Sequence, residues 1–300
     1  MIRRAALALA LVALAPTGAR GDDALDAQVQ AVLAEPGDAV QAGVWFGAPA
    51  GEPRYQLAAE RALPAASVVK TALLVELFAA HAGHLDDPLG ADAVLADDQH
   101  AAMAPFSAAQ RTEIRATLAG ATVRTVGAIM MGSRKASNAV YNAAANLTIA
   151  ALGGPAAASA KLRARDPAFG GIAVGRYMLA SRKASDNQAT PAALAAVLAA
   201  IATAKLPGVD PATAEAIAQA MMQTKDPLGV HRHKEGNLDN DPMVVIRTGF
   251  YLRGNGKPPL VYVVGAALSA RPTGNRDAAH RRLDKMTDAI HALLRAAAGR

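Results

Sequence analysis

Residues 66–78, ASVVKTALLVELF, set a hydroxyl and an amine at the head of an apolar run. Residues three apart lie on one face of an α-helix, with about 5–6 Å between their Cβ atoms. A helix from Ala65 to about Ala82 would therefore hold Ser67 beside Lys70. The residues that follow are apolar enough for a core, where a lysine is costly unless it is used.

This pair has the chemistry of a nucleophile and its base. A serine hydroxyl becomes nucleophilic when a base lies within hydrogen-bonding reach, and a lysine with a lowered pKa can be that base. The free N–H groups at a helix start can also stabilise an oxyanion. The plainer interpretation is a capping serine followed by a lysine that extends to solvent.

A second candidate element is VVIRTGFY, residues 244–251, which is typical of a strand. Arg247 and Thr248 could bind a substrate carboxylate, and Gly249 would let the substrate lie close to the backbone. Phe250 could then offer its backbone N–H as a second oxyanion donor. The alternative is an edge-strand arginine next to a bulge.

Composition narrows the functional classes. The 300 residues carry a net charge of +6 and only 4% aromatic residues, and their lysines and arginines are scattered, which argues against nucleic-acid binding. There is no cysteine, so no disulfide forms. His231 and His233 stand in what we interpret as a loop without a cysteine or carboxylate partner, so we expect neither a metal nor another cofactor.

The N-terminus is predicted to be a signal peptide over residues 1–21. Arg3 and Arg4 precede an apolar stretch, and the small residues Ala19 and Gly21 precede a plausible cleavage point. The apolar stretch is too short to span a membrane. We expect a secreted or periplasmic protein with no membrane span after cleavage.

Both ends of the chain contribute to one predicted sheet. The expected strands are 41–47, 54–60, 242–252 and 259–270. The expected helices outside the middle of the chain are 25–35, 210–223 with Asp210 as its cap, and about 276–298. Residues 105–205 are rich in alanine and leucine and have helical periods.

S-x-x-K followed by R-T-G resembles the serine β-lactamase and penicillin-binding family, whose signature is S-x-x-K, S-D-N and K-T-G. Three further segments are similar to class A members: TVRTVGAIMM (122–131), NLTIAALGG (146–154) and ATPAALAAVLAAI (189–201). The resemblance implies an α/β (α+β) fold with a five-stranded antiparallel sheet flanked by the terminal helices. It also implies an α/β part over about 25–65 and 206–300, an all-α part over about 66–205, and an active site between them.

The S-D-N element departs from the family pattern. One register sets Asn138 at the asparagine position, where it would bind the substrate's side-chain amide, and leaves Ala136 in place of the serine. Counting back from residue 146 instead sets Val140, Tyr141 and Asn142 there. The hydroxyl that relays a proton could then be Ser137, Tyr141 or neither. A true SDN stands at 185–187, where capping residues are expected.

The resemblance also implies a deacylation base. In LRARDPAFGG, residues 162–171, Asp166 stands where the family has a glutamate and Gly170 where it has an asparagine. Aspartate is one methylene shorter, and misplacement on this scale can cost about 10²-fold in rate. Slow deacylation is therefore expected.

These observations predict a serine hydrolase that opens a β-lactam ring through an acyl-enzyme on Ser67. A penicillin-binding or D,D-peptidase-like acyl enzyme with poor turnover is the first alternative, and a non-catalytic envelope-binding module is the second. The expected partner is a small β-lactam or a peptidoglycan-like peptide, and we expect a monomer.

Overall fold

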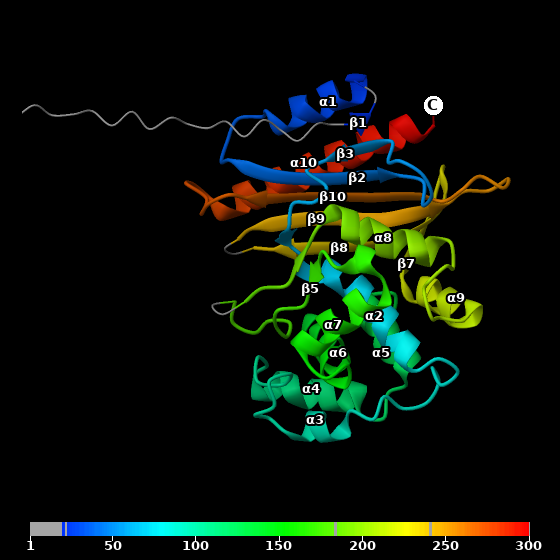
Figure 1. The fold of residues 1–300 in the computed structure, drawn as a ribbon. Helices are drawn as coiled ribbons and strands as arrows, with labels where there is room; N and C mark the ends of the chain where they lie inside the picture. The colour runs from blue at the N-terminus through cyan, green and yellow to red at the C-terminus, as the bar shows by residue number, and fades with distance from the viewer. Residues whose placement is uncertain (1–19, 22, 183–184, 240–241, 300) are drawn as a thin grey trace, which may run out of the picture.

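A computed structural model describes residues 20–21, 23–182, 185–239 and 242–299 (Figure 1). The predicted signal peptide, residues 1–21, lies outside the described residues except for Arg20 and Gly21, which form a short strand. Within the described ranges, no helix has both the length and the apolar character needed to cross a membrane.

The helices follow most of the sequence predictions. The α-helices of the described residues are α1 (Asp23–Leu33), α2 (Val69–Ala80), α3 (Asp92–Ala96), α4 (Ala108–Leu118), α5 (Val123–Met131), α6 (Asn138–Ala151), α7 (Pro155–Arg165), α8 (Pro191–Ala202), α9 (Pro211–Ala220) and α10 (Arg276–Ala298). Two short 3-10 helices, η1 (Ala66–Val68) and η2 (Pro167–Phe169), interrupt the connections. Asp210 caps α9 as predicted, because its side chain accepts a hydrogen bond from the Thr213 N–H.

The strands form one large and one small antiparallel sheet. They are β1 (Arg20–Gly21), β2 (Val40–Gly47), β3 (Tyr55–Leu57), β4 (Leu63–Pro64), β5 (Ile172–Ala173), β6 (Gln188–Ala189), β7 (Met222–Asp226), β8 (Gly229–Leu238), β9 (Val244–Leu252) and β10 (Leu260–Leu268). The large sheet runs β1-β3-β2-β10-β9-β8-β7 and the small one β4-β6-β5. The predicted fold class is confirmed, with β1 and β7 extending the expected five strands to seven.

The large sheet separates two cores. On one face α10 packs against β9 and β10, and α1 packs against α10 (Figure 1). On the other face α8 lies against the sheet, and α2, α5, α6 and α7 follow beyond it (Figure 1). Alternate side chains of each strand point to opposite faces, so Val245 of β9 enters the first core and Ile246 the second. The termini of the chain therefore build one side of the molecule.

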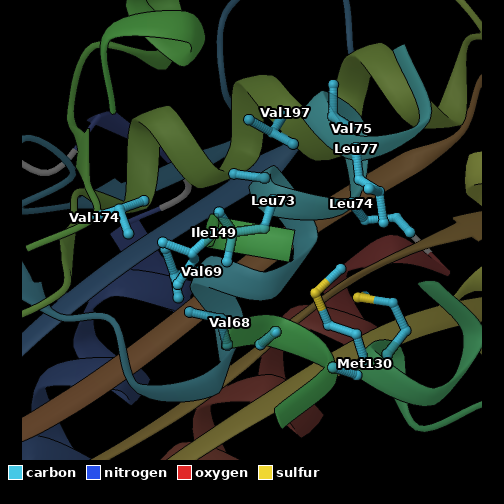
Figure 2. Close-up of a cluster of buried hydrophobic side chains, with 14 of the residues drawn as sticks. Val68, Val69, Leu73, Leu74, Val75, Leu77, Met130, Ile149, Val174 and Val197 are labelled. Carbon is cyan, nitrogen blue, oxygen red and sulfur yellow. The ribbon is translucent and has the colours of Figure 1, made fainter. Parts of the chain in front are cut away.

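Helix α2 is the centre of the helical block. Every residue from Val69 to Phe78 is buried, and a helix that is apolar on all sides is stable only inside a core. Figure 2 shows Leu73, Leu74 and Leu77 of this helix within a cluster of buried side chains that also includes Met130 of α5 and Val197 of α8. The polar side chains of α2 are therefore held in apolar surroundings.

The segment around residue 231 corrects one prediction. His231 and His233 lie on strand β8, not in a loop. Their rings stack with centroids 4.5 Å apart, and His231 also stacks on Tyr251 at 4.5 Å. Beside them His291 of α10 stacks on Tyr262 at 4.0 Å. The five rings form a cluster that joins the sheet to α10.

Acidification from pH 7 to pH 5 should destabilise the fold through this cluster. Burial, followed by the nearby His233, lowers the pKa of His231 to about 4, and burial lowers the pKa of His291 to about 3. Both shifts start from 6.5, so the unfolded chain binds protons first, and stability present above pH 6.5 is lost as the pH falls toward 4. We expect a loss of about 2 kcal/mol at pH 5 after allowing for partial exposure, measured by urea unfolding.

A matched pair of variants isolates the cluster. The double substitution His231→Gln and His291→Gln should reduce the difference in unfolding free energy between pH 7 and pH 5. His84→Gln should change that difference much less, because His84 is exposed and its contact is the exposed Asp87, not a ring of the cluster. An unchanged difference in the double variant contradicts the assignment.

Candidate active site

Ser67 lies in η1, directly before α2, and lines a cavity of about 500 Å³. The other walls are the first turn of α6, the loop from Arg176 to Arg182, and the end of β8. Ser67 itself is half-buried. The predicted nucleophile therefore lies where the sheet meets the helical block, open to a cavity large enough for a small molecule.

The backbone at Ser67 is fixed in a strained form. Ala66 has φ of +46°, a left-handed conformation that costs a non-glycine residue on the order of 1–3 kcal/mol. Its neighbour Ala65 donates its N–H to the Asn187 carbonyl at 2.8 Å. On the other side, a Cβ on Gly236 of β8 would lie 3.0 Å from the Ser67 nitrogen. Strain of this kind persists only where the surroundings impose it, which is common at functional sites.

Lys70 is fully buried one helical turn after Ser67. Its Nζ donates to Asn142 Oδ1 at 2.9 Å and lies 3.1 Å from the centroid of the Tyr141 ring. Within the described residues, no carboxylate forms an ion pair with this amine. Burial, and then the charge of Lys234, lowers the pKa of Lys70 well below 10.5. An amine shifted in this way can accept a proton from a neighbouring hydroxyl.

Strand β8 supplies residues that the sequence analysis missed. Its pairing with β7 ends at His233, so the rest of β8 has a free edge that packs against η1. Lys234 is buried there, with its Nζ 5.3 Å from the Tyr141 ring centroid. Gly236 abuts Ser67, and Asn237 lines the cavity. The usable signal was Lys234-Glu235-Gly236, which has the spacing of K-T-G with glutamate in place of threonine.

The structure does not bring the Arg247 side chain to the cavity. Its side chain lies on the face of the sheet covered by α10, where its guanidinium meets Asp284 at 2.6 Å and Asp288 at 3.1 Å. It also lies 3.6 Å from Glu235 of β8. The cavity is on the opposite face, so Arg247 joins the sheet to α10 instead of binding a substrate carboxylate.

The rest of the R-T-G element lies inside the sheet. Thr248 is buried and donates its hydroxyl to the Lys234 carbonyl at 2.7 Å. Gly249 pairs with His233 and Phe250 with Arg232 of β8, while β10 flanks them on the other side. None of Thr248, Gly249 and Phe250 lines the cavity. The structure does not bring these three residues to the cavity, because the element lies one strand inward from the edge that faces Ser67.

The start of α6 supports the second register of the degraded S-D-N element. Asn142 accepts from Lys70 and donates to the Asn138 carbonyl at 2.9 Å, and both asparagines line the cavity. Ser137 is exposed and caps α6 by accepting from the Val140 N–H at 3.3 Å. Of the two hydroxyl candidates, only the Tyr141 side chain contacts Lys70.

The structure does not bring Asp166 to the cavity. Its carboxylate caps η2 by accepting from the Ala168 N–H at 2.9 Å. The adjacent Arg165 pairs with Glu76, nine residues beyond Ser67 on α2. Among the described residues that line the cavity, Asp239 is the one with a carboxylate. The expectation that Asp166 stands beside Ser67 as the deacylation base is therefore not supported by its placement.

The true SDN sequence has a structural role in the loop that walls the cavity. Ser185 donates its hydroxyl to the Gly175 carbonyl, and Asp186 pairs with Arg176 at 2.8 Å. Asn187 accepts from the N–H groups of Gly175 and Arg176 at 2.9 and 3.1 Å. These contacts fix the loop, as expected for capping residues.

Comparison with known proteins agrees with this geometry. The model of the beta-lactamase enzyme family matches residues 24–251, which is most of the chain. The chain belongs to the β-lactamase enzyme family. As a member of this family it is a serine hydrolase of the type that acts on β-lactam amides, and the resemblance seen in the sequence is confirmed. No significant match was found among curated protein sequences.

Solved structures show the same fold. A variant of the class A β-lactamase of the last common ancestor of Gram-negative bacteria has a TM-score of 0.62 at 20% identity, over 89% of this chain and 97% of its own. A β-lactamase from Desulfarculus baarsii has a TM-score of 0.63 at 16% identity, over 91% and 97%. One from Sphaerobacter thermophilus has 0.58 at 21%, over 89% and 95%. At these identities the likeness establishes the fold alone.

Replacing each of two cations should separate their roles. Arg247→Ala should lower the unfolding free energy by about 2 kcal/mol, because it leaves carboxylates of α10 unpaired, but should change acylation by a β-lactam less than threefold. Lys234→Ala should slow acylation by about 10²-fold. Stopped-flow acylation and urea unfolding of both variants test this, and a large acylation defect in Arg247→Ala contradicts the placement.

Gly236→Val should slow acylation by about 10²-fold, because the new side chain must push β8 away from the Ser67 nitrogen. Gly254→Val is the matched control, since nothing lies within 4 Å of a Cβ at that position. The same acylation assay applies. Equal rates in the two variants would show that the contact between β8 and η1 does not matter for the reaction.

Proposed function

We propose that β-lactams acylate this protein on Ser67 and that the acyl group is then released slowly. The observation that carries the proposal is the pairing of a half-buried serine that opens to a cavity with a buried lysine whose pKa is lowered and which no described carboxylate neutralises. This arrangement favours the first step of hydrolysis and leaves the second without an evident base.

In the acylation step, Lys70 takes the proton of the Ser67 hydroxyl as its oxygen attacks the β-lactam carbonyl. The backbone N–H groups of Ser67 and Asn237 are the proposed oxyanion donors, because both line the cavity where η1 meets the free edge of β8. When the C–N bond breaks, the Lys70 ammonium returns the proton to the nitrogen. The proton lost by Ser67 thus ends on the former β-lactam nitrogen, and the proposed step uses no cofactor.

The proposed substrate contacts are two asparagines that line the cavity and Lys234, which is buried two residues before Gly236 on β8. Asn138 and Asn142 line the cavity beside Ser67 and are the proposed partners of the substrate's side-chain amide. Lys234 replaces Arg247 as the proposed partner of the substrate carboxylate, because it lies on the face of β8 that meets the Tyr141 ring next to Lys70. A small peptidoglycan-like peptide with a terminal carboxylate would meet the same groups.

Deacylation needs a water activated by a base. The Asp166 carboxylate is engaged in capping η2, and the carboxylate of Asp239, directly after β8, lies 3.1 Å from His280 of α10. These engagements favour the penicillin-binding type of acyl enzyme over a β-lactamase with rapid turnover. The presence of Asp239 in the cavity is the observation that favours turnover, with this carboxylate as the base.

Export of the protein is a further part of the proposal. The sequence of residues 1–21 has the pattern of a secretory signal, and both proposed substrates are encountered outside the cytoplasm. A monomer is proposed as the working form. The mass of the protein purified from an exporting host, compared with the mass of the chain from Asp22, checks the cleavage point.

Incubation of the mature protein with benzylpenicillin should add the mass of one intact penicillin, because ring opening loses no atoms. Peptide mapping should locate the adduct on Ser67. Ser67→Ala should abolish the adduct, and Lys70→Ala should slow its formation by at least about 10²-fold. An adduct that survives in Ser67→Ala would exclude this nucleophile.

Asp166→Asn should leave the rate of acyl release within about twofold of the unchanged protein, because this carboxylate caps η2 away from the cavity. Asp239→Asn is the informative partner, since its carboxylate lines the cavity. Release is followed as loss of the adduct mass after excess penicillin is removed. A release rate that falls by 10-fold or more in Asp166→Asn would restore the role implied by the family resemblance.

A further inference from the structure

Tyr141 presents its ring to two lysines at once. The ring centroid lies 3.1 Å from Lys70 Nζ and 5.3 Å from Lys234 Nζ. An ammonium group within about 6 Å of an aromatic centroid is attracted to the negative face of the ring. Tyr141 is half-buried in the first turn of α6, where its N–H donates to the Ser137 carbonyl at 2.9 Å. One ring therefore lies against two like charges from different elements.

The carboxylates close to the two lysines in sequence are engaged elsewhere. Glu76 of α2 pairs with Arg165 of α7 at 2.5 Å. Glu235 of β8 lies on the opposite face of the sheet, 3.6 Å from Arg247. Asn142, the hydrogen-bond partner of Lys70, is uncharged. Within the described residues, the Tyr141 ring is the group of opposite electrostatic sign that contacts both ammonium groups.

The other elements around α2 add no counter-charge. Helix α8 has no charged residue, Arg124 of α5 and Glu215 of α9 are exposed, and α7 adds the exposed Lys161 and Arg163 besides its paired arginine. Arg232, on the same face of β8 as Lys234, donates to the Gln219 carbonyl at 3.3 Å. Any stabilisation of charge on the two lysines must therefore come from polar or aromatic neighbours.

We propose that Tyr141 is a positioning residue that holds the ammonium groups of Lys70 and Lys234 against its ring and so fixes the base beside Ser67. The role rests on the proposed function, in which Lys70 carries the proton from Ser67 to the leaving nitrogen. Burial and the like charge of Lys234 both favour the neutral form of Lys70. The ring favours the charged form, so it keeps Lys70 able to hold the proton between the two transfers.

The test is a titration of Lys70 that needs no β-lactam. Protein labelled with ¹³C at the lysine ε-carbons is titrated by NMR, and Lys70→Arg identifies the resonance. Tyr141→Phe keeps the ring and should leave the pKa of Lys70 within about 0.3 units. Tyr141→Leu should lower it by about one unit. Tyr141→Phe carrying one, two and three ring fluorines should lower it stepwise, because fluorine weakens the negative face at nearly constant shape.

Controls decide between the ring, the hydroxyl and a general effect of fluorine. The same fluorinated rings at buried Phe106, which has no cation against its face in the described structure, should leave the Lys70 pKa unchanged. A flat response through the fluorine series overturns the proposal, and so does a full shift in Tyr141→Phe, which would assign the effect to the hydroxyl. Failure of penicillin to label Ser67 would instead overturn the proposed function and leave the titration result standing.

Discussion

The site depends on the burial of one amine, that of Lys70, in a helix that is otherwise apolar. The position of helix α2 is fixed because every residue from Val69 to Phe78 is enclosed by the sheet and the helical block. Enclosure removes water from the amine, which lowers its pKa and so favours the neutral form that can accept a proton. The same enclosure requires close neighbours for its polar atoms, and these are Asn142 and Tyr141 of α6.

The position of Ser67 also depends on the edge of the large sheet formed by β8. β7 stops pairing at His233, and the free edge of β8 beyond it meets η1, so that Gly236 touches the Ser67 backbone. Because of the pleat, neighbouring residues of β8 face opposite sides of the sheet. Lys234 faces the helical block, while Glu235 faces α10 and Arg247. A shift of one residue in the β8 register would exchange these roles.

Much of the fold was predictable because it follows from local chemistry. Asp210 and Pro211 begin α9, and α10 covers residues 276–298 as the sequence pattern indicates. Ser67 and Lys70 were predicted from helical spacing together with the family resemblance. Strand β8 was missed because its run of histidine, lysine and glutamate lacks the apolar alternation of a half-buried strand. On the face toward α10 these side chains contact aromatic rings and Arg247, and on the other face Lys234 lies near the Tyr141 ring.

The remaining differences between prediction and structure arise because the sequence shows which residue types are present but not how the strands and helices pair. R-T-G on β9 has the composition of a carboxylate-binding element, but only pairing shows that β8 lies between it and Ser67. Asp166 next to proline is equally suited to capping a 3-10 turn and to activating water, and sequence gives no means of choosing. The position of the Tyr141 ring between two lysines depends on how α6 packs against α2 and β8, which no local pattern specifies.

The pH dependence of the second-order rate constant for acylation of Ser67 by benzylpenicillin tests the central claim most directly. If Lys70 is a base with a lowered pKa, the rate reaches its plateau well below pH 10.5, the ordinary value for lysine, and Lys70→Ala loses that plateau. A rate that rises continuously to pH 10.5 in both proteins would contradict the account, because hydroxide and not the buried amine would then remove the proton.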